Sequence, residues 1–131
     1  DIDWYDPQLR GVMPIAGLHV PRRLLRTMSR HPYIITFNRD FAGVMAGCAG
    51  DGGGHTVLRD STWINDEIIA VFTDLHAQGD AHSVEAWQIN DGRAELVGGI
   101  YGMALGGALF GESMFSRARD ASKIALVFLV A

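Results

Sequence analysis

The chain has 131 residues, of which 48% are hydrophobic and 20% charged, and its formal net charge is −4 at pH 7. This composition is typical of a globular domain rather than a disordered segment, and the length suits a single domain with its own core. The acidic balance excludes a protein that binds nucleic acid over its whole surface, and the single cysteine, Cys48, excludes an internal disulfide. We therefore expect a cytoplasmic protein without a membrane partner.

A helix with an unusual charge pattern is predicted after an irregular N-terminal segment, in which Trp4 and Tyr5 are expected to cover an edge of the core. Pro21 suits the first turn of this helix. Arg23, Arg26 and Arg30 recur at i, i+3 and i+7 and therefore line one face. Arg22 adds a fourth positive charge, and the apolar side chains are expected on the other side: Leu24, Leu25 and Met28. Two readings stay open, a solvated surface helix or a phosphate-binding face.

Two capped helices are predicted in the middle of the chain, after a strand over residues 33–37. Asp40 is expected to cap a helix over 41–49, and Asn65 to cap one that ends at Gly79. Their apolar side chains recur at helical spacing and predict two core-facing stripes. The members are Phe41, Val44, Met45 and Cys48, then Ile68, Val71, Phe72 and Leu75.

Two sequence features of the kind that bind a phosphate or a metal are incomplete. The glycine-rich run 50–54 is not followed by the Gly-Lys-Ser/Thr of a phosphate-binding loop. His76 and His82 lack the spacing and the further ligands of a metal site, so both are read as structural. We expect neither a metal nor another cofactor.

Three sequential strands and a final helix are predicted in the second half of the chain. A strand over 82–88 leads into Asn90-Asp91-Gly92, which is typical of a tight hairpin turn. Two further strands lie between residues 95 and 117 and are joined near Gly106-Gly107, and Asp120 is expected to cap the last helix. The order of elements indicates an α+β fold with an antiparallel-rich sheet and flanking helices.

Glu112 is the most unusual residue of the last predicted strand. By the two-residue period it shares one face with Phe110, Met114 and Ser116. An unpaired carboxylate in such apolar surroundings is costly to bury. Glu112 therefore meets either a fixed donor in the core or a ligand.

Several blocks of the chain resemble the leucyl/phenylalanyl-tRNA–protein transferase family. The most specific is Glu112-Ser113-Met114-Phe115-Ser116-Arg117. Others follow in the family's order and at similar spacing: 10–12, 62–64, 82–87, 96–102 and 120–123. The resemblance implies a GNAT-like acyltransferase fold, with 1–131 as most of that domain. It also implies an internal fragment that lacks the family's N-terminal segment and its C-terminal catalytic portion.

The resemblance implies a reaction and its partners. Leu or Phe, and with them Met, would move from aminoacyl-tRNA to the N-terminal Arg or Lys of a protein, which is thereby marked for degradation. Glu112 would orient an ammonium group or accept its proton, Trp63 would stack on the terminal adenosine, and Arg22 and Arg26 would meet the acceptor arm. The amino-acid pocket would comprise Ile100, Leu109, Gly111, Met114, Ser116 and Phe72. We expect a monomer.

Two departures limit what the resemblance implies. The family often has Tyr where this chain has Phe72, which removes a hydroxyl near the ester. The family's proposed proton-relay residues belong to a portion beyond residue 131, so we expect the fragment alone to be inactive. Two alternatives stay open: a module that binds aminoacyl-tRNA ends without chemistry, and a GNAT-type small-molecule acetyltransferase, which the lack of a clear pyrophosphate-binding loop disfavours.

Overall fold

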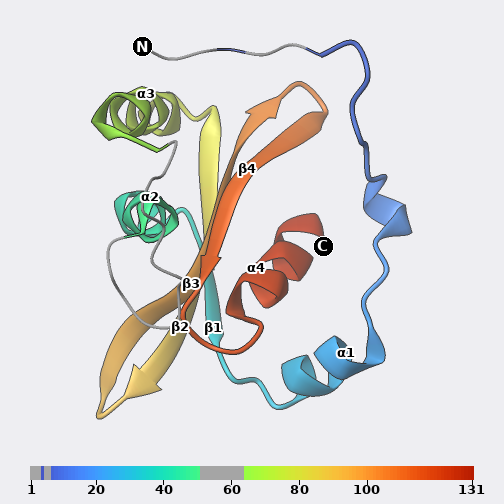
Figure 1. Cartoon of the computed structure of the whole chain (residues 1–131). Helices are drawn as coiled ribbons and strands as arrows, with labels where there is room; N and C mark the ends of the chain where they lie inside the picture. Colours follow the sequence, from blue (N-terminus) through green and yellow to red (C-terminus); the bar gives the residue numbers. More distant parts are fainter. Residues whose placement is uncertain (1–3, 5–6, 51–63) are drawn as a thin grey trace.

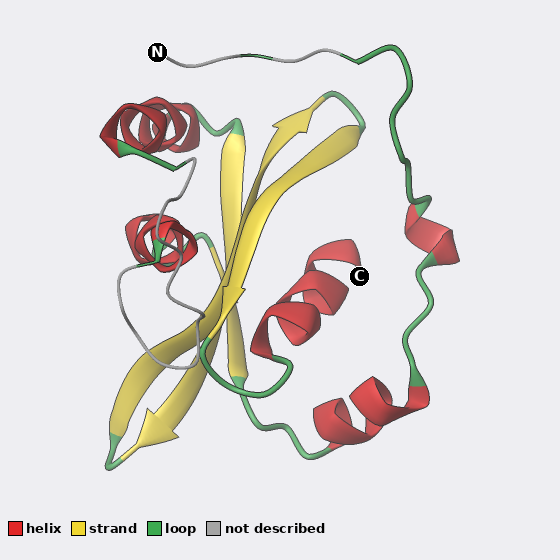
Figure 2. Ribbon diagram, in the orientation of Figure 1, coloured by secondary structure: helices red, strands yellow, loops and turns green. Residues whose placement is uncertain are grey.

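The computed structural model describes Trp4, residues 7–50 and residues 64–131. Within this part of the chain, four strands form one antiparallel sheet in sequence order. The strands are β1 (Ile34–Phe37), β2 (Ala81–Asn90), β3 (Arg93–Leu105) and β4 (Ala108–Ser116). The predicted α+β fold with an antiparallel sheet and flanking helices is confirmed (Figures 1 and 2).

Helices cover both faces of the sheet. On one side lie α2 (Phe41–Ala49) and α3 (Asp66–Ala77), and on the other lies α4 (Ala121–Val130), as Figure 1 shows. We call these two sides the α2/α3 face and the α4 face. A short 3₁₀ turn, η1 (Ile15–Gly17), and helix α1 (Arg22–Ser29) precede the sheet.

Local turn chemistry sets both hairpins. Asn90 pairs with Arg93, so Asp91 and Gly92 form a two-residue turn, and both have positive φ, 51° and 76°. This backbone matches the right-handed twist of the strands and favours Asx-Gly sequences. Leu105 pairs with Ala108 around Gly106, whose φ is 60°. Both predicted turns are confirmed.

Two of the three predicted helix caps are present. The Asp40 carboxylate accepts from the Gly43 amide at 2.9 Å, and the Asn65 side chain accepts from the Ile68 amide at 2.9 Å. Asp120 occupies the predicted N-cap position of α4, but it does not cap the helix through its side chain. Its backbone is left-handed, with φ 57°, and its side chain makes no cap bond. It lies instead 3.7 Å from the Lys123 ammonium.

The larger core cluster lies on the α2/α3 face. The predicted stripe of α2 is buried there together with Phe72, Tyr101 and Phe115. Gly47 allows α2 to approach the sheet, because a Cβ atom at this position would lie 2.6 Å from the Phe115 ring. The α4 face has a smaller cluster around Val84, Ile100 and Ala125.

The N-terminal segment packs less than the sequence predicts. Trp4 is 65% exposed, so the prediction that it covers the core edge is wrong, and Tyr5 lies outside the described residues. In α1 only Leu24 is buried, and Leu25 is 50% exposed, against the prediction of a full apolar side. No described residue before Leu24 is buried. The N-terminal segment therefore gives Trp4 and Leu25 few buried neighbours to pack against.

Candidate functional site

A register shift between β3 and β4 places Glu112 outside the regular strand pairing. Tyr101 pairs with Ser113, and the next residue, Gly102, pairs with Gly111. Glu112 is therefore the extra residue of a β-bulge, a feature that re-aims a side chain and is common beside active sites.

The bulge breaks the alternation that the sequence predicts for β4. Met114 pairs with Ile100 and Phe110 pairs with Met103. Because Ile100 and Met103 are three residues apart on β3, Phe110 and Met114 face opposite sides of the sheet. The prediction that Phe110, Glu112, Met114 and Ser116 share one face is wrong, since a bulge cannot be read from the two-residue period.

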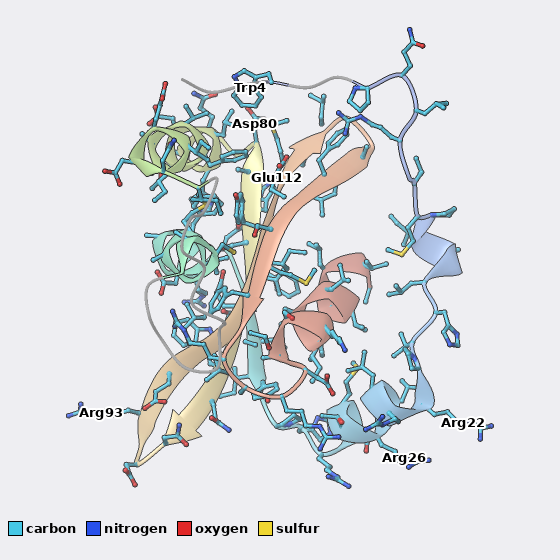
Figure 3. All side chains as sticks on the ribbon, in the orientation of Figure 1. Trp4, Arg22, Arg26, Asp80, Arg93 and Glu112 are labelled. Carbon is cyan, nitrogen blue, oxygen red and sulfur yellow. The ribbon has the colours of Figure 1, made fainter. Side chains whose placement is uncertain are left out.

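The surroundings of Glu112 place it on the α2/α3 face. The Arg10 guanidinium lies 5.4 Å from the centre of the Phe110 ring. Burial raises the pKa of Glu112, and the nearby positive charge of Arg10 lowers it. Burial also raises the pKa of Tyr101, with smaller contributions from Cys48 and from Glu112. Glu112 is thus a half-buried carboxylate within electrostatic reach of a buried tyrosine, at the end of the sheet where Asp80 precedes β2 (Figure 3).

Five of the six predicted pocket residues share the α4 face. Those on β4 pair with alternate residues of β3, and partners two apart lie on one face. The pairs are Gly98↔Ser116, Ile100↔Met114, Gly102↔Gly111 and Ala104↔Leu109, and Ile100 itself is the fifth member.

Ile100 forms the buried floor of this group. It packs with Val84 and Ala125, and two residues of α4, Leu126 and Leu129, lie against the same cluster. Met114 is 41% exposed and Leu109 42%. A Cβ atom on Gly111 would meet only the Ile100 Cδ1 atom, at 3.8 Å. The surface is apolar and partly open, and its role in binding an amino-acid side chain stays a prediction.

Phe72 lies on the other face of the sheet. It is buried, and its ring contacts Tyr101 edge to face, with 5.3 Å between ring centres. The structure therefore does not bring Phe72 or Glu112 together with Ile100 and Met114 on one side. The predicted amino-acid pocket, which joins Phe72 to Ile100 and Met114, therefore draws on both faces of the sheet.

The arginine-rich helix exposes its positive charges. Arg22 and Arg26 project away from the sheet in Figure 3, and Arg23 and Arg30 are also exposed. No acidic residue lies in the first turn of α1. Trp63, the predicted stacking residue, lies outside the described residues.

The two histidines considered for a metal site make hydrogen bonds within the fold. A ring nitrogen of His76, Nδ1, lies 2.8 Å from the Ala81 carbonyl oxygen, and Nδ1 of His82 lies 3.1 Å from the Asn38 side-chain nitrogen. Within residues 7–50 and 64–131, no group of three or more His, Cys, Asp or Glu side chains is placed to hold a metal ion.

The sequence analysis missed a buried carboxylate, Glu85. Its side chain is fully buried and accepts from the Thr36 hydroxyl at 2.7 Å, the Arg39 amide at 3.0 Å and the Ser83 hydroxyl. Trp87 in turn donates to the Thr36 hydroxyl oxygen at 2.8 Å. The signal was a charged residue flanked by Val84 and Ala86 in a predicted strand. Tyr101 was also missed, because an isolated Tyr in an apolar strand looks like packing.

Comparisons with known proteins agree with the sequence blocks. A family model described as leucyl/phenylalanyl-tRNA protein transferase matches residues 12–131. A leucyl/phenylalanyl-tRNA–protein transferase of Ruegeria sp. (strain TM1040) is 51% identical over 130 residues, which are 99% of this chain and 56% of the relative. One from Rhodopseudomonas palustris (strain HaA2) is 52% identical over 128 residues, 98% of this chain and 54% of the relative.

The chain spans about half the length of the curated relatives it matches. None of the helices in the part of the chain that the structure describes has both the length and the hydropathy of a membrane span. Because the family model covers nearly the whole sequence, the chain belongs to the leucyl/phenylalanyl-tRNA protein transferase family.

Proposed function

We propose that the chain is part of an aminoacyltransferase that moves Leu or Phe, and with them Met, from aminoacyl-tRNA to the N-terminal Arg or Lys of an acceptor protein. The observation that carries the proposal is the family match over residues 12–131. The product would expose a bulky apolar N-terminus that marks the acceptor for degradation.

The reaction is an acyl transfer that needs no co-reactant other than the aminoacyl-tRNA and the acceptor. The acceptor's deprotonated α-amine attacks the ester carbonyl of the aminoacyl-tRNA, and a tetrahedral oxyanion forms. The ester C–O bond then breaks, the peptide bond remains, and the 3′ oxygen of the tRNA leaves with a proton. Such a reaction gains most from positioning of the two substrates and from support of the oxyanion.

Two features of the structure suit these requirements. They lie on opposite faces of the sheet, but both include residues of the edge strand β4, around which one site could draw on both faces. The apolar surface around Ile100 and Met114 could receive the transferred side chain, and it would disfavour a charged one because a buried charge must be desolvated. Glu112 is half-buried, in a bulge that can re-aim it, and a carboxylate there could orient an ammonium group or accept its proton.

The tRNA would contact other parts of the molecule. The exposed arginines of α1, among them Arg22 and Arg26, would bind phosphates of the acceptor arm. Trp63 would stack on the terminal adenosine, a common way to hold an unpaired 3′ end.

We also propose a fold, a division of the catalytic residues, an oligomeric state and a cellular location for the whole protein. A four-stranded antiparallel sheet covered by helices on both faces is compatible with a GNAT-like acyltransferase domain, of which residues 1–131 would form most. Since the relatives are about twice as long, we propose that the remaining portion supplies the proton relay and that this chain alone is inactive. The protein would act as a cytoplasmic monomer.

The deciding experiment follows labelled Leu from charged tRNA to a peptide that begins with Arg, with the full-length protein as catalyst. Transfer to this peptide, and none to a matched peptide that begins with Ala, is the expected result. Binding of the charged tRNA without transfer would favour the non-catalytic module. Turnover of acetyl-CoA with no aminoacyl transfer would favour a small-molecule acetyltransferase.

A further inference from the structure

Tyr101 has a buried hydroxyl group with no hydrogen-bond partner among the described residues. The side chain is 1% exposed, and its ring makes edge contacts with Phe41 and Phe72. A buried hydroxyl without a partner destabilises a fold, whereas Phe would fill almost the same volume without that penalty. The hydroxyl at this position therefore calls for an explanation other than packing.

The half-buried carboxylate of Glu112 offers that explanation. Tyr101 pairs with Ser113, the residue after Glu112. Arg10, which acts on the Glu112 carboxylate, lies over the Phe110 ring and so puts Glu112 on the same face of the sheet as Tyr101. Each group lacks a direct bond to the other, and a single water molecule can bridge two polar groups that are too far apart for direct contact.

We propose that Tyr101 is a positioning residue for Glu112, to whose carboxylate its hydroxyl donates through one bridging water molecule. Burial raises the pKa of Tyr101, so the phenol stays protonated and remains a donor at every pH at which the protein works. The hydrogen bond would stabilise the ionised form of Glu112 and hold it in one orientation. The consequence for ammonium binding rests on the proposed function.

Other titratable groups lie near this pair, and two of them, Arg10 and Cys48, act on its pKa values. Arg10 comes from the N-terminal segment and lowers the pKa of Glu112. Cys48 of α2 and Glu112 both raise the pKa of Tyr101. From α3, His76 stacks on Phe41 at 4.2 Å, and Asp80 lies exposed at the same end of the sheet. None of these groups supplies the Tyr101 hydroxyl with an acceptor.

The test replaces the hydroxyl alone, as Tyr101→Phe, in the full-length protein. The pKa of Glu112 is followed by carboxyl-carbon NMR, and kcat/KM for transfer is measured against pH. The loss of a donor to a carboxylate raises its pKa, so the acid limb of the rate profile should move to higher pH. On that limb we expect kcat/KM to fall by roughly tenfold, the value of one hydrogen bond to a charged group.

Tyr33→Phe is the matched control. The Tyr33 hydroxyl donates to the Arg119 carbonyl oxygen at 2.7 Å, and the ring packs with the cluster around Ala86, Val97 and Ala121. Its removal should leave both the pKa of Glu112 and the pH profile unchanged.

The outcomes separate the two proposals. An unchanged pKa of Glu112 in a Tyr101→Phe variant that melts at a higher temperature would overturn the inference, because the hydroxyl would then be only an unsatisfied group. If the full-length protein transfers no amino acid, the proposed function fails, while the NMR titration still decides whether Tyr101 acts on Glu112. If Tyr101→Phe does not fold, 3-fluorotyrosine at position 101, a stronger donor, should lower the pKa of Glu112, and no change would overturn the inference.

Discussion

Gly98 of β3 lies directly beneath Ala121, the first residue of α4. A Cβ atom on Gly98 would come within 2.5 Å of the Ala121 Cβ and 3.0 Å of its carbonyl carbon. The Ser122 amide that follows donates to the Ser116 hydroxyl oxygen at 3.3 Å. Close approach of strand and helix thus anchors α4 over the apolar surface around Ile100.

Gly98→Ala should displace the start of α4 and destabilise the domain. The contact is with the Ala121 Cβ atom and with backbone atoms, none of which can rotate away, and overpacking of this kind costs about 1–3 kcal/mol. Thermal unfolding measures the loss. Gly107→Ala is the control, since nothing lies within 4 Å of a Cβ there. Equal melting temperatures for the two variants would contradict the close contact between Gly98 and the start of α4.

Glu85→Gln should destabilise the fold through the junction of β1, β2 and α2. Glu85 accepts hydrogen bonds from the Thr36 and Ser83 hydroxyls and from the Arg39 amide. An amide nitrogen in place of one carboxylate oxygen would face a donor, and an unsatisfied buried group costs about 1–3 kcal/mol. Denaturant unfolding tests this. Glu95→Gln, at an exposed site on β3, should change the midpoint little.

Glu112→Gln should raise stability at neutral pH while it lowers the rate of transfer. Burial raises the pKa of Glu112 above its unfolded value, so the native state binds the proton more readily than the unfolded state. The ionised carboxylate therefore opposes folding above its native pKa, and this opposition fades as the pH falls through that pKa. Gln removes it.

Melting temperatures across a pH series measure this effect. The gain from Glu112→Gln over the parent should be largest above the native pKa of Glu112 and should shrink on acidification. A gain that grows towards low pH would mean that the carboxylate is stabilised when charged, against the environment described above.

Arg22→Ala combined with Arg26→Ala should reduce the salt dependence of tRNA binding in the full-length protein. Each duplex phosphate contact contributes about −0.9 to the slope of log affinity against log salt, so the slope should flatten by up to about 2. The loss should be equal for Leu- and Phe-charged tRNA, because phosphate contacts carry no information about the amino acid.

A salt titration of binding measures the slope. Arg93→Ala, at the tip of the β2–β3 hairpin, is the control, and Figure 3 shows it well away from α1. An unchanged slope in the double variant would mean that these arginines belong to a solvated surface and do not bind phosphates. A loss selective for one amino acid would place them at the pocket instead.

Trp63→Ala should weaken binding of aminoacyl-adenosine to the full-length protein by roughly 1–3 kcal/mol, the value of a base stacked on an aromatic ring. Calorimetry with a non-hydrolysable analogue measures the affinity. Trp87→Phe is a useful contrast, because Trp87 donates to Thr36 inside the fold and its loss should lower the melting temperature rather than the affinity. The reverse pattern would assign Trp63 to the core.

Features that depend on neighbouring residues were predictable from the sequence. The Asp40 and Asn65 caps follow from side chains that reach amides three residues on. The Asn90-Asp91-Gly92 turn follows from residues that tolerate positive φ. The family assignment also follows from contiguous blocks, such as 112–117, that need no fold to be read.

Features that depend on distant strands were decided only by the tertiary structure. The bulge at Glu112 exists because β3 and β4 slip by one residue between Tyr101 and Gly102, and hydrogen bonds across the sheet set that slip. It moves Glu112 to the face opposite Met114, although both belong to one six-residue block. Tertiary packing also explains why the Tyr101 hydroxyl has no hydrogen-bond partner among the described residues, because Phe41 and Phe72 enclose it from helices far away in the sequence. Residue types and local spacing thus determined the elements and the family, whereas strand register and packing decided which side chains share a face.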